Sequence, residues 1–221
     1  MARSPFPGII SLVQAQQTVK RHLGPRVNVF IDDKFSFALS TEVAFKHGLR
    51  PGLKLDEETI EQLLGEDGES KALQSALTFL GHRARSEAEI RTRLLKDEWT
   101  EPVIVRVLER LRNAHLVDDG GFAQNWVENR SRFRPRGGRL LQQELRQKGV
   151  AREDIEAALP DSNEEEDNAL LALQKSARKW QLPDEREAQR KAIEFLARRG
   201  FGYSSAKAAW TRFREEDDEE E

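Results

Sequence analysis

An arginine-rich segment at residues 130–139 is the part of this sequence whose side chains are best suited to bind a charged partner. It holds five arginines in ten positions, with Phe133 among them. Guanidinium groups bind phosphates and carboxylates through paired hydrogen bonds, and an aromatic ring beside them can stack on a base. The alternative is a solvated loop whose charges only flank two helices. The candidate binding residues are Arg130, Arg132, Arg134, Arg136, Arg139 and Lys148.

The surroundings of this segment add to its positive charge. Residues 130–148 contain seven basic side chains and one acid, Glu144, which gives a net charge of +6. A Gly-Gly pair precedes a predicted helix, whose free backbone N–H groups also favour an anion. Gly149 fits the left-handed cap after that helix. We therefore expect Lys148 mainly to stabilise the negative end of this helix, and a contact with a partner is its less favoured role.

The remaining reactive side chains indicate no catalytic centre. Asp118 and Asp119 resemble an acid pair, but adjacent carboxylates without further spaced ligands form a poor metal site, so we predict that they cap a helix. Cysteine is absent and the four histidines have no paired spacing, which argues against zinc. The chain lacks a phosphate loop ending in Gly-Lys-Ser/Thr. We expect no metal, no cofactor and no enzymatic activity.

Four tryptophans offer base-stacking surfaces, but their positions favour the protein core. Trp99 and Trp210 occupy repeat positions that we predict to be buried. Trp126 shares an apolar stripe with Phe122 and is assigned to the core as well. The environment of Trp180, at a predicted helix end, stays open.

The apolar residues repeat every 51 residues, and this period predicts the fold. From residue 71 onward they recur with a helical period, giving three short helices per unit that bury their stripes on one another. We predict a mainly α fold, an elongated tandem array of three three-helix repeats. The equivalent positions are Leu94, Leu145 and Leu196; Trp99, Val150 and Phe201; Ile104, Ile155 and Ala206; and Leu108, Leu159 and Trp210.

The middle repeat departs from this period in one place. Residues 79–83 align with residues 126–130 at a spacing of 47 rather than 51. About four extra residues therefore fall between the first and second helices of the middle repeat, within the arginine-rich segment. Because an insertion confined to one repeat often lies on its binding face, it marks this connection as the candidate site.

The N-terminal region predicts a small α+β segment ahead of the repeats. Residues 27–31 and 35–39 alternate between apolar and polar residues, and Asp32-Asp33-Lys34 suits a tight turn. This pattern predicts a β-hairpin. Residues 17–23 are a candidate third strand.

Two short helices should follow the hairpin. We predict that Thr41 caps a helix ending at Gly48, and that Asp56 caps another ending near Leu64. Residues 65–69 contain two glycines and are predicted to be a linker. The predicted domains are residues 1–70, 71–118, 119–160 and 161–214, followed by an acidic tail at 215–221.

Charge is segregated along the chain. Residues 71–160 carry a net charge of +4 and residues 161–214 a net charge of +2, whereas the last seven residues are all acidic. Such a tail cannot bury apolar surface, so we predict that it is disordered. No apolar run approaches the ~20 residues of a membrane helix, and the first residues do not form a signal peptide. We expect a soluble, cytoplasmic monomer that does not contact membranes.

Three passages resemble the RecX family of recombination regulators. The first is residues 79–90, with Phe79 and Leu80 ahead of an Arg-x-Arg-Ser sequence. The second is residues 116–123, where a leucine precedes an Asp-Asp pair and Phe-Ala. The third is Gly138 with residues 144–150. Gly120 and Gly121, inserted after the Asp pair, depart from the pattern, and the acidic tail is not part of it.

The resemblance implies a modulator that binds the filament of the RecA recombinase on DNA. Such proteins are stacks of three-helix repeats that lie in the filament groove and suppress ATP hydrolysis, strand exchange and filament growth. The resemblance places the chain in DNA repair, recombination and the SOS response. It leaves open whether the chain also binds single- or double-stranded DNA directly.

The alternative function is a stand-alone DNA-binding protein built from helix-turn-helix-like repeats. Each third helix would then need base-reading residues near its start. The corresponding residues, 101–103, 152–154 and 203–205, include three acids and a proline. This composition argues against a repeated reading head.

Overall fold

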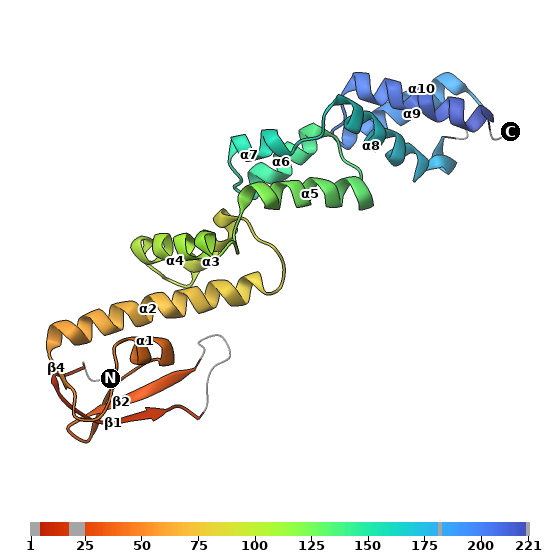
Figure 1. Ribbon diagram of the computed structural model, residues 1–221. Helices are drawn as coiled ribbons and strands as arrows, with labels where there is room; N and C mark the ends of the chain where they lie inside the picture. The colour runs from red at the N-terminus through yellow and green to blue at the C-terminus, as the bar shows by residue number, and fades with distance from the viewer. Residues whose placement is uncertain (1–4, 18–24, 181–182, 220–221) are drawn as a thin grey trace. The chain divides into compact units, whose positions relative to one another are not determined.

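The structure is a computed structural model that describes residues 5–17, 25–180 and 183–219, with side chains described as far as residue 216 (Figure 1). Its described residues form ten α-helices and four β-strands. They divide into two compact units. One contains residues 1–85 and 89–117, and the other contains residues 86–88 and 118–221. No helix in the described part of the chain is long and apolar enough to cross a membrane.

The first unit begins with a small antiparallel sheet in the order β3-β2-β1-β4. The predicted hairpin is confirmed, with Asp32 and Asp33 at positive φ values of 48° and 63° in the turn between β2 and β3. Positive φ at both central residues is typical of the type I′ turn, whose twist matches the twist of the two strands that it joins. The strands are β1 (Gly8–Ala15), β2 (Arg26–Ile31), β3 (Lys34–Ser40) and β4 (Lys54–Leu55).

Two of these strands were not expected. β1 supplies the strand that pairs with β2, and its partner β4 is only two residues long. The third strand that the sequence predicted at residues 17–23 lies almost wholly outside the described residues.

The short helix α1 (Thr41–Lys46) begins one residue earlier than expected. Its cap is Ser40 rather than Thr41, because the Ser40 hydroxyl accepts a hydrogen bond from the Val43 N–H at 3.2 Å. Gly48 follows the helix with a φ of 60°. The predicted stop at Gly48 is therefore confirmed, and the predicted cap at Thr41 is wrong.

The predicted linker at residues 65–69 is also wrong, since it lies inside the 24-residue helix α2 (Glu57–Leu80). Asp56 caps this helix as expected. Two helical glycines cost stability, but buried contacts of Asp67 outweigh this local preference. Asp67 is only 1% exposed, its carboxylate pairs with Arg26 at 3.0 Å, and it accepts a hydrogen bond from the Ser40 backbone at 2.6 Å.

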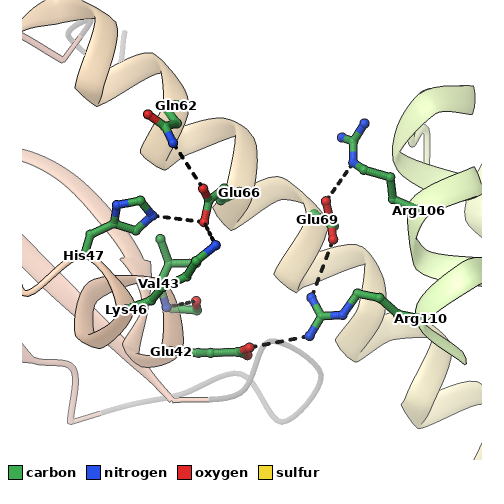
Figure 2. Close-up of polar contacts among 10 residues, drawn as sticks. Glu42, Val43, Lys46, His47, Gln62, Glu66, Glu69, Arg106 and Arg110 are labelled. Carbon is green, nitrogen blue, oxygen red and sulfur yellow. Dashed lines mark hydrogen bonds and ion pairs between the residues drawn. The ribbon is translucent and has the colours of Figure 1, made fainter. Parts of the chain in front are cut away.

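Because α2 is continuous, the sheet domain and the first repeat share one helix. Figure 2 shows the ion pairs that hold both to it. On one side, Lys46 and His47 contact the Glu66 carboxylate at 2.8 and 3.0 Å. On the other, Arg106 of α4 contacts Glu69 at 2.7 Å, while Arg110 lies 3.5 Å from Glu69 and from Glu42 of α1.

The three-helix repeats are confirmed. The equivalent leucines Leu94, Leu145 and Leu196 are all fully buried, each in a separate apolar cluster. The first repeat consists of the second half of α2, α3 (Glu87–Lys96) and α4 (Glu101–Asn113). The second consists of α5 (Asp119–Phe133), α6 (Gly138–Gln147) and α7 (Arg152–Ala158). The third consists of α8 (Ser162–Gln174), a short 3-10 helix (Ala177–Lys179), α9 (Glu185–Arg198) and α10 (Tyr203–Glu219).

The acidic tail differs from the sequence prediction. Helix α10 continues to Glu219, so residues 215–219 are helical rather than disordered, and the last two residues lie outside the described part. Gln174 donates a hydrogen bond to the Glu216 carboxylate at 2.7 Å. A helix that is anchored in the core by Trp210 and Phe213 extends its hydrogen-bond ladder into polar sequence by simple propagation.

Candidate binding surface on the second repeat

The arginine-rich segment is mostly helical, not a loop as predicted. Helix α5 runs to Phe133 and α6 starts at Gly138, which leaves only residues 134–137 as a connection. Arg130 and Arg132 lie in the last turn of α5, and Arg139 lies in the first turn of α6. The four extra residues are close to one helical turn, so they lengthen α5 instead of forming a long loop.

Glu144 is the centre of a polar cluster on this repeat. Its carboxylate accepts hydrogen bonds from the Trp126 indole N–H and from Arg130 Nε, both at 2.8 Å, and from a guanidinium N–H of Arg136. The Glu144 side chain is 13% exposed. Two of the predicted binding arginines are therefore held by one internal carboxylate, which fixes where their remaining N–H groups point.

The ring of Trp126 lies beneath two cations. The Arg130 guanidinium carbon is 4.5 Å and the Lys148 Nζ is 5.3 Å from its centroid. Phe122 packs at 5.9 Å from the same ring. The predicted core placement of Trp126 is confirmed only in part, since it is partly buried against the core of the repeat. Lys148 is the cap residue of α6 and Gly149 follows at a φ of 74°, as predicted.

The other three candidate arginines face solvent. Arg132, Arg134 and Arg139 are exposed, and the ring of Phe133 is 62% exposed beside them. The Arg132 guanidinium carbon lies 5.3 Å from the Phe133 ring centroid. Neither Arg134 nor Arg139 forms an ion pair with the residues that the structure describes. We call Arg132, Phe133, Arg134 and Arg139 the arginine surface.

The connection at residues 134–137 is anchored on the third repeat. Pro135 and Gly137 are buried, and the Gly137 N–H donates to the Arg199 carbonyl at 2.9 Å. A Cβ atom on Gly137 would lie 2.3 Å from the Phe201 nitrogen, so only glycine fits there. The arginine surface therefore stands on a rigid base.

Arg199 is a further cation at this place that the sequence reasoning missed. Its guanidinium N–H lies 3.4 Å from the Pro135 carbonyl oxygen. Burial lowers the pKa of Arg199, and the nearby charge of Arg136 lowers it further. Arg199 follows Lys148 by 51 residues. The repeat period was thus a signal that could have identified it.

The start of α6 already holds an anion from the chain itself. The Gly138 N–H donates to one Glu165 carboxylate oxygen at 3.0 Å, and the Ser205 hydroxyl donates to the other at 3.1 Å. The sequence predicted that this helix start favours an anion. In the structure the Glu165 side chain supplies that negative charge.

The Asp-Asp pair is structural, although only partly as predicted. Asp118 occupies the cap position of α5 but makes no side-chain hydrogen bond to the helix. Asp119 instead accepts from the Glu87 N–H at 2.8 Å, and burial raises the pKa of Asp119. Within the described ranges no group of three or more histidine, aspartate or glutamate side chains could hold a metal ion.

A small α+β domain followed by three three-helix repeats defines a helical-repeat protein whose charged groups lie on repeat surfaces. Comparison with family models gives the same division. The matches are the RecX N-terminal domain at residues 8–56, and the first, second and third RecX three-helix domains at residues 72–111, 118–159 and 164–210. The chain belongs to the RecX family of regulatory proteins, as the resemblance implied.

Individual relatives support this assignment. The regulatory protein RecX of Leuconostoc mesenteroides is 32% identical over 198 residues, covering 88% of this chain and 74% of the relative. That of Listeria monocytogenes serovar 1/2a is 33% identical over 204 residues, covering 91% and 74%. A crystal structure of a regulatory protein RecX matches with a TM-score of 0.73 and 26% identity over 94% of this chain and 98% of that one. RecX from Lactobacillus salivarius shares the fold, with a TM-score of 0.62.

Proposed function

We propose that this chain regulates DNA recombination and repair by binding the RecA nucleoprotein filament. Binding would restrain ATP hydrolysis by the filament, strand exchange and filament growth. The observation that carries the proposal is the family match in four consecutive pieces, in the same order as in the RecX family. A chain of similar repeats suits a partner that is itself repetitive, because each repeat can meet an equivalent site.

The arginine surface is the contact that we propose for this partner. Its three exposed guanidinium groups can bind phosphates of the DNA or carboxylates of the recombinase through paired hydrogen bonds. Arg130 and Arg136, both held by Glu144, and Lys148 at the Trp126 ring extend the same positive area. Preorganised side chains lose less conformational entropy when a partner binds.

The proposal assigns no reaction to this chain. The ATP hydrolysis belongs to the filament, and the chain acts on it by binding alone, in the cytoplasm and as a monomer. DNA by itself is a weaker partner in this proposal than DNA coated with recombinase.

Co-sedimentation tests the partner directly. The full chain is mixed with cognate RecA filaments on single-stranded DNA, with RecA alone, and with the same DNA alone. Sedimentation mainly with the assembled filaments supports the proposal. Equal binding to naked DNA would favour the stand-alone DNA-binding alternative, and no binding to filaments would reject the proposed function.

A further inference from the structure

A pocket in the first repeat has no part in the proposed function. It encloses about 490 Å³ and opens to solvent beside the second half of α2 and the end of α3. Trp99, Phe79, Lys71 and Arg93 contribute to its wall. Aromatic and cationic side chains with polar groups between them make a wall that can bind a planar, charged molecule.

Trp99 is the side chain in this pocket that points to a ligand. The other three tryptophans each pack on an aromatic ring: Trp126 on Phe122, Trp180 on Phe195 and Trp210 on Phe213, at 5.0–5.9 Å between centroids. Among the described residues, the Trp99 ring has no aromatic or cationic partner, and its indole N–H has no acceptor.

Trp99 is also more exposed than the residues at the equivalent positions of the other two repeats. The equivalent residues Val150 and Phe201 are 6% and 3% exposed, whereas Trp99 is only partly buried at the edge of its core. On its inner side it lies against α2, where a Cβ atom on Gly68 would be 3.8 Å from the ring. The predicted core position of Trp99 is confirmed only in part, since Trp99 is partly buried against the core of the first repeat.

The polar wall of the pocket is held in place before any ligand arrives. The Asp97 carboxylate accepts from the Ser75 hydroxyl at 2.8 Å and from Arg93 Nε at 3.0 Å. Lys71 Nζ lies 2.8 Å from the buried Asp67 carboxylate and is 31% exposed. Arg93 uses its Nε to bind Asp97, so its two terminal nitrogens can still donate to a ligand, and its side chain is 46% exposed. The pocket therefore combines one carboxylate acceptor with two cations that are oriented by internal partners.

One face of the second aromatic ring is already covered. The Arg85 guanidinium carbon lies 3.8 Å from the Phe79 centroid, which leaves the Trp99 ring as the better stacking surface in the lining of the pocket. A ligand for this site needs a planar ring for Trp99, polar edges for Asp97 and the indole N–H, and a negative group for the cations. A nucleobase with its phosphate has all three features. An acidic peptide lacks the ring.

We propose that this pocket binds one unstacked base of a single-stranded nucleic acid, with the base on Trp99 and its phosphate at Lys71 and Arg93. Bases in a duplex are paired and stacked, and they cannot enter without being extruded. The site lies on another repeat than the arginine surface and does not depend on RecA. Its test therefore needs no recombinase.

Fluorescence anisotropy with a labelled short oligo(dT) measures the site in the full chain. Trp99→Val copies the residue of the second repeat and should weaken binding about 5- to 150-fold, the range expected for one lost base stack. Trp99→Phe copies the third repeat and should restore part of the affinity. Lys96→Gln, which removes an exposed charge from α3 outside the pocket, is the control and should stay within about twofold, as one screened surface charge allows.

An abasic oligomer of the same length separates the base from the phosphates. It should bind the parent weakly and be insensitive to Trp99→Val. Equal loss for both oligomers, or unchanged oligo(dT) affinity in Trp99→Val, would overturn the proposal. If Trp99→Val fails to fold, photocross-linking of the unmodified chain to an iodouracil-containing oligomer decides the question. Cross-links at Trp99 support the proposal, and cross-links only elsewhere contradict it.

Discussion

At the scale of single residues, several carboxylates of this chain each bind and orient two cationic side chains. Asp67 holds Arg26 and Lys71, Glu66 holds Lys46 and His47, and Glu144 holds Arg130 and Arg136. A carboxylate that accepts several charge-assisted hydrogen bonds orients its partners more strongly than an isolated surface pair does. These residues are therefore the natural places to test how charge is organised.

Glu144→Gln should release part of the positive charge near the arginine surface. We expect the variant to be less stable by about 1–3 kcal/mol, since it removes hydrogen bonds to a charged group. We also expect tighter binding to nucleic acid at low salt, because Arg130 and Arg136 become free to meet phosphates. Thermal unfolding and a salt titration of DNA affinity measure both effects.

The control for this variant is Glu156→Gln, which removes the same charge from an exposed pair with Arg152 on α7. It should change stability little, because exposed pairs contribute about 0–1 kcal/mol. Matching effects of the two substitutions would mean that Glu144 has no special role.

Glu66 gives the first unit a pH dependence. Hydrogen bonds from Lys46 and then His47 lower the pKa of Glu66 from 4.5 to about 2. A carboxyl group whose pKa is lower in the folded state stabilises the fold above its unfolded pKa and loses that contribution as the pH falls. The stability contributed by Glu66 is thus present above about pH 4.5 and fades toward pH 2.

Comparing the parent with Glu66→Gln at a series of pH values tests this. The difference in unfolding free energy should be largest near neutral pH and should shrink steadily below pH 4.5. Glu61→Gln is the control, because Glu61 is exposed on the same helix and forms no ion pair within the described ranges. A Glu66 difference that stays constant down to pH 2 would contradict the assignment.

At the scale of helices and strands, local patterns predicted the elements but not where they end. The equivalent leucines and the alternating strands were sufficient to find the repeats and the hairpin, since burial repeats with the period of each element. The ends depend on contacts between distant residues. Asp67 keeps α2 helical through two glycines, and the packing of Pro135 and Gly137 on the third repeat sets where α5 stops.

The candidate site shows the same limit. Residue types and one insertion located the arginine-rich segment, because an excess of charge can be counted from sequence. The sequence could not predict which arginines bind Glu144 and which face solvent, because this depends on which side chains reach Glu144 in the folded repeat. The open ring of Trp99 was hidden for the same reason, because its repeat position predicted burial.

The arginine surface, at the end of α5 and the start of α6, can be tested by substitution. Replacing Arg132, Arg134 and Arg139 with alanine should leave helicity and melting nearly unchanged, because the three side chains are exposed. Inhibition of the filament should weaken, and the salt dependence of binding should flatten by about one unit for each phosphate that the variant no longer binds.

A second triple variant controls for total charge. Arg186, Arg190 and Lys191 are exposed cations on α9 of the third repeat, and their replacement by alanine removes the same three charges. Full inhibition by the arginine-surface variant at every salt concentration, or equal weakening in both triples, would show that this surface is not the specific contact.

At the scale of the whole molecule, the C-terminal residues and the repeats carry net charges of opposite sign. Residues 215–221 carry seven carboxylates, while residues 71–214 carry a net charge of +6. Deleting residues 215–221 should strengthen DNA binding at low salt, and the gain should shrink as salt screens the charges. Identical affinities of the two proteins at low ionic strength would rule out this role for the tail.

ATP hydrolysis by the recombinase filament is the activity that binding of this chain should change. ATP hydrolysis by cognate RecA on single-stranded DNA is followed while the full chain is added. We expect hydrolysis to fall at substoichiometric or near-stoichiometric ratios of chain to RecA. Hydrolysis that continues at its full rate across a wide titration, up to a large excess of the chain, would contradict it.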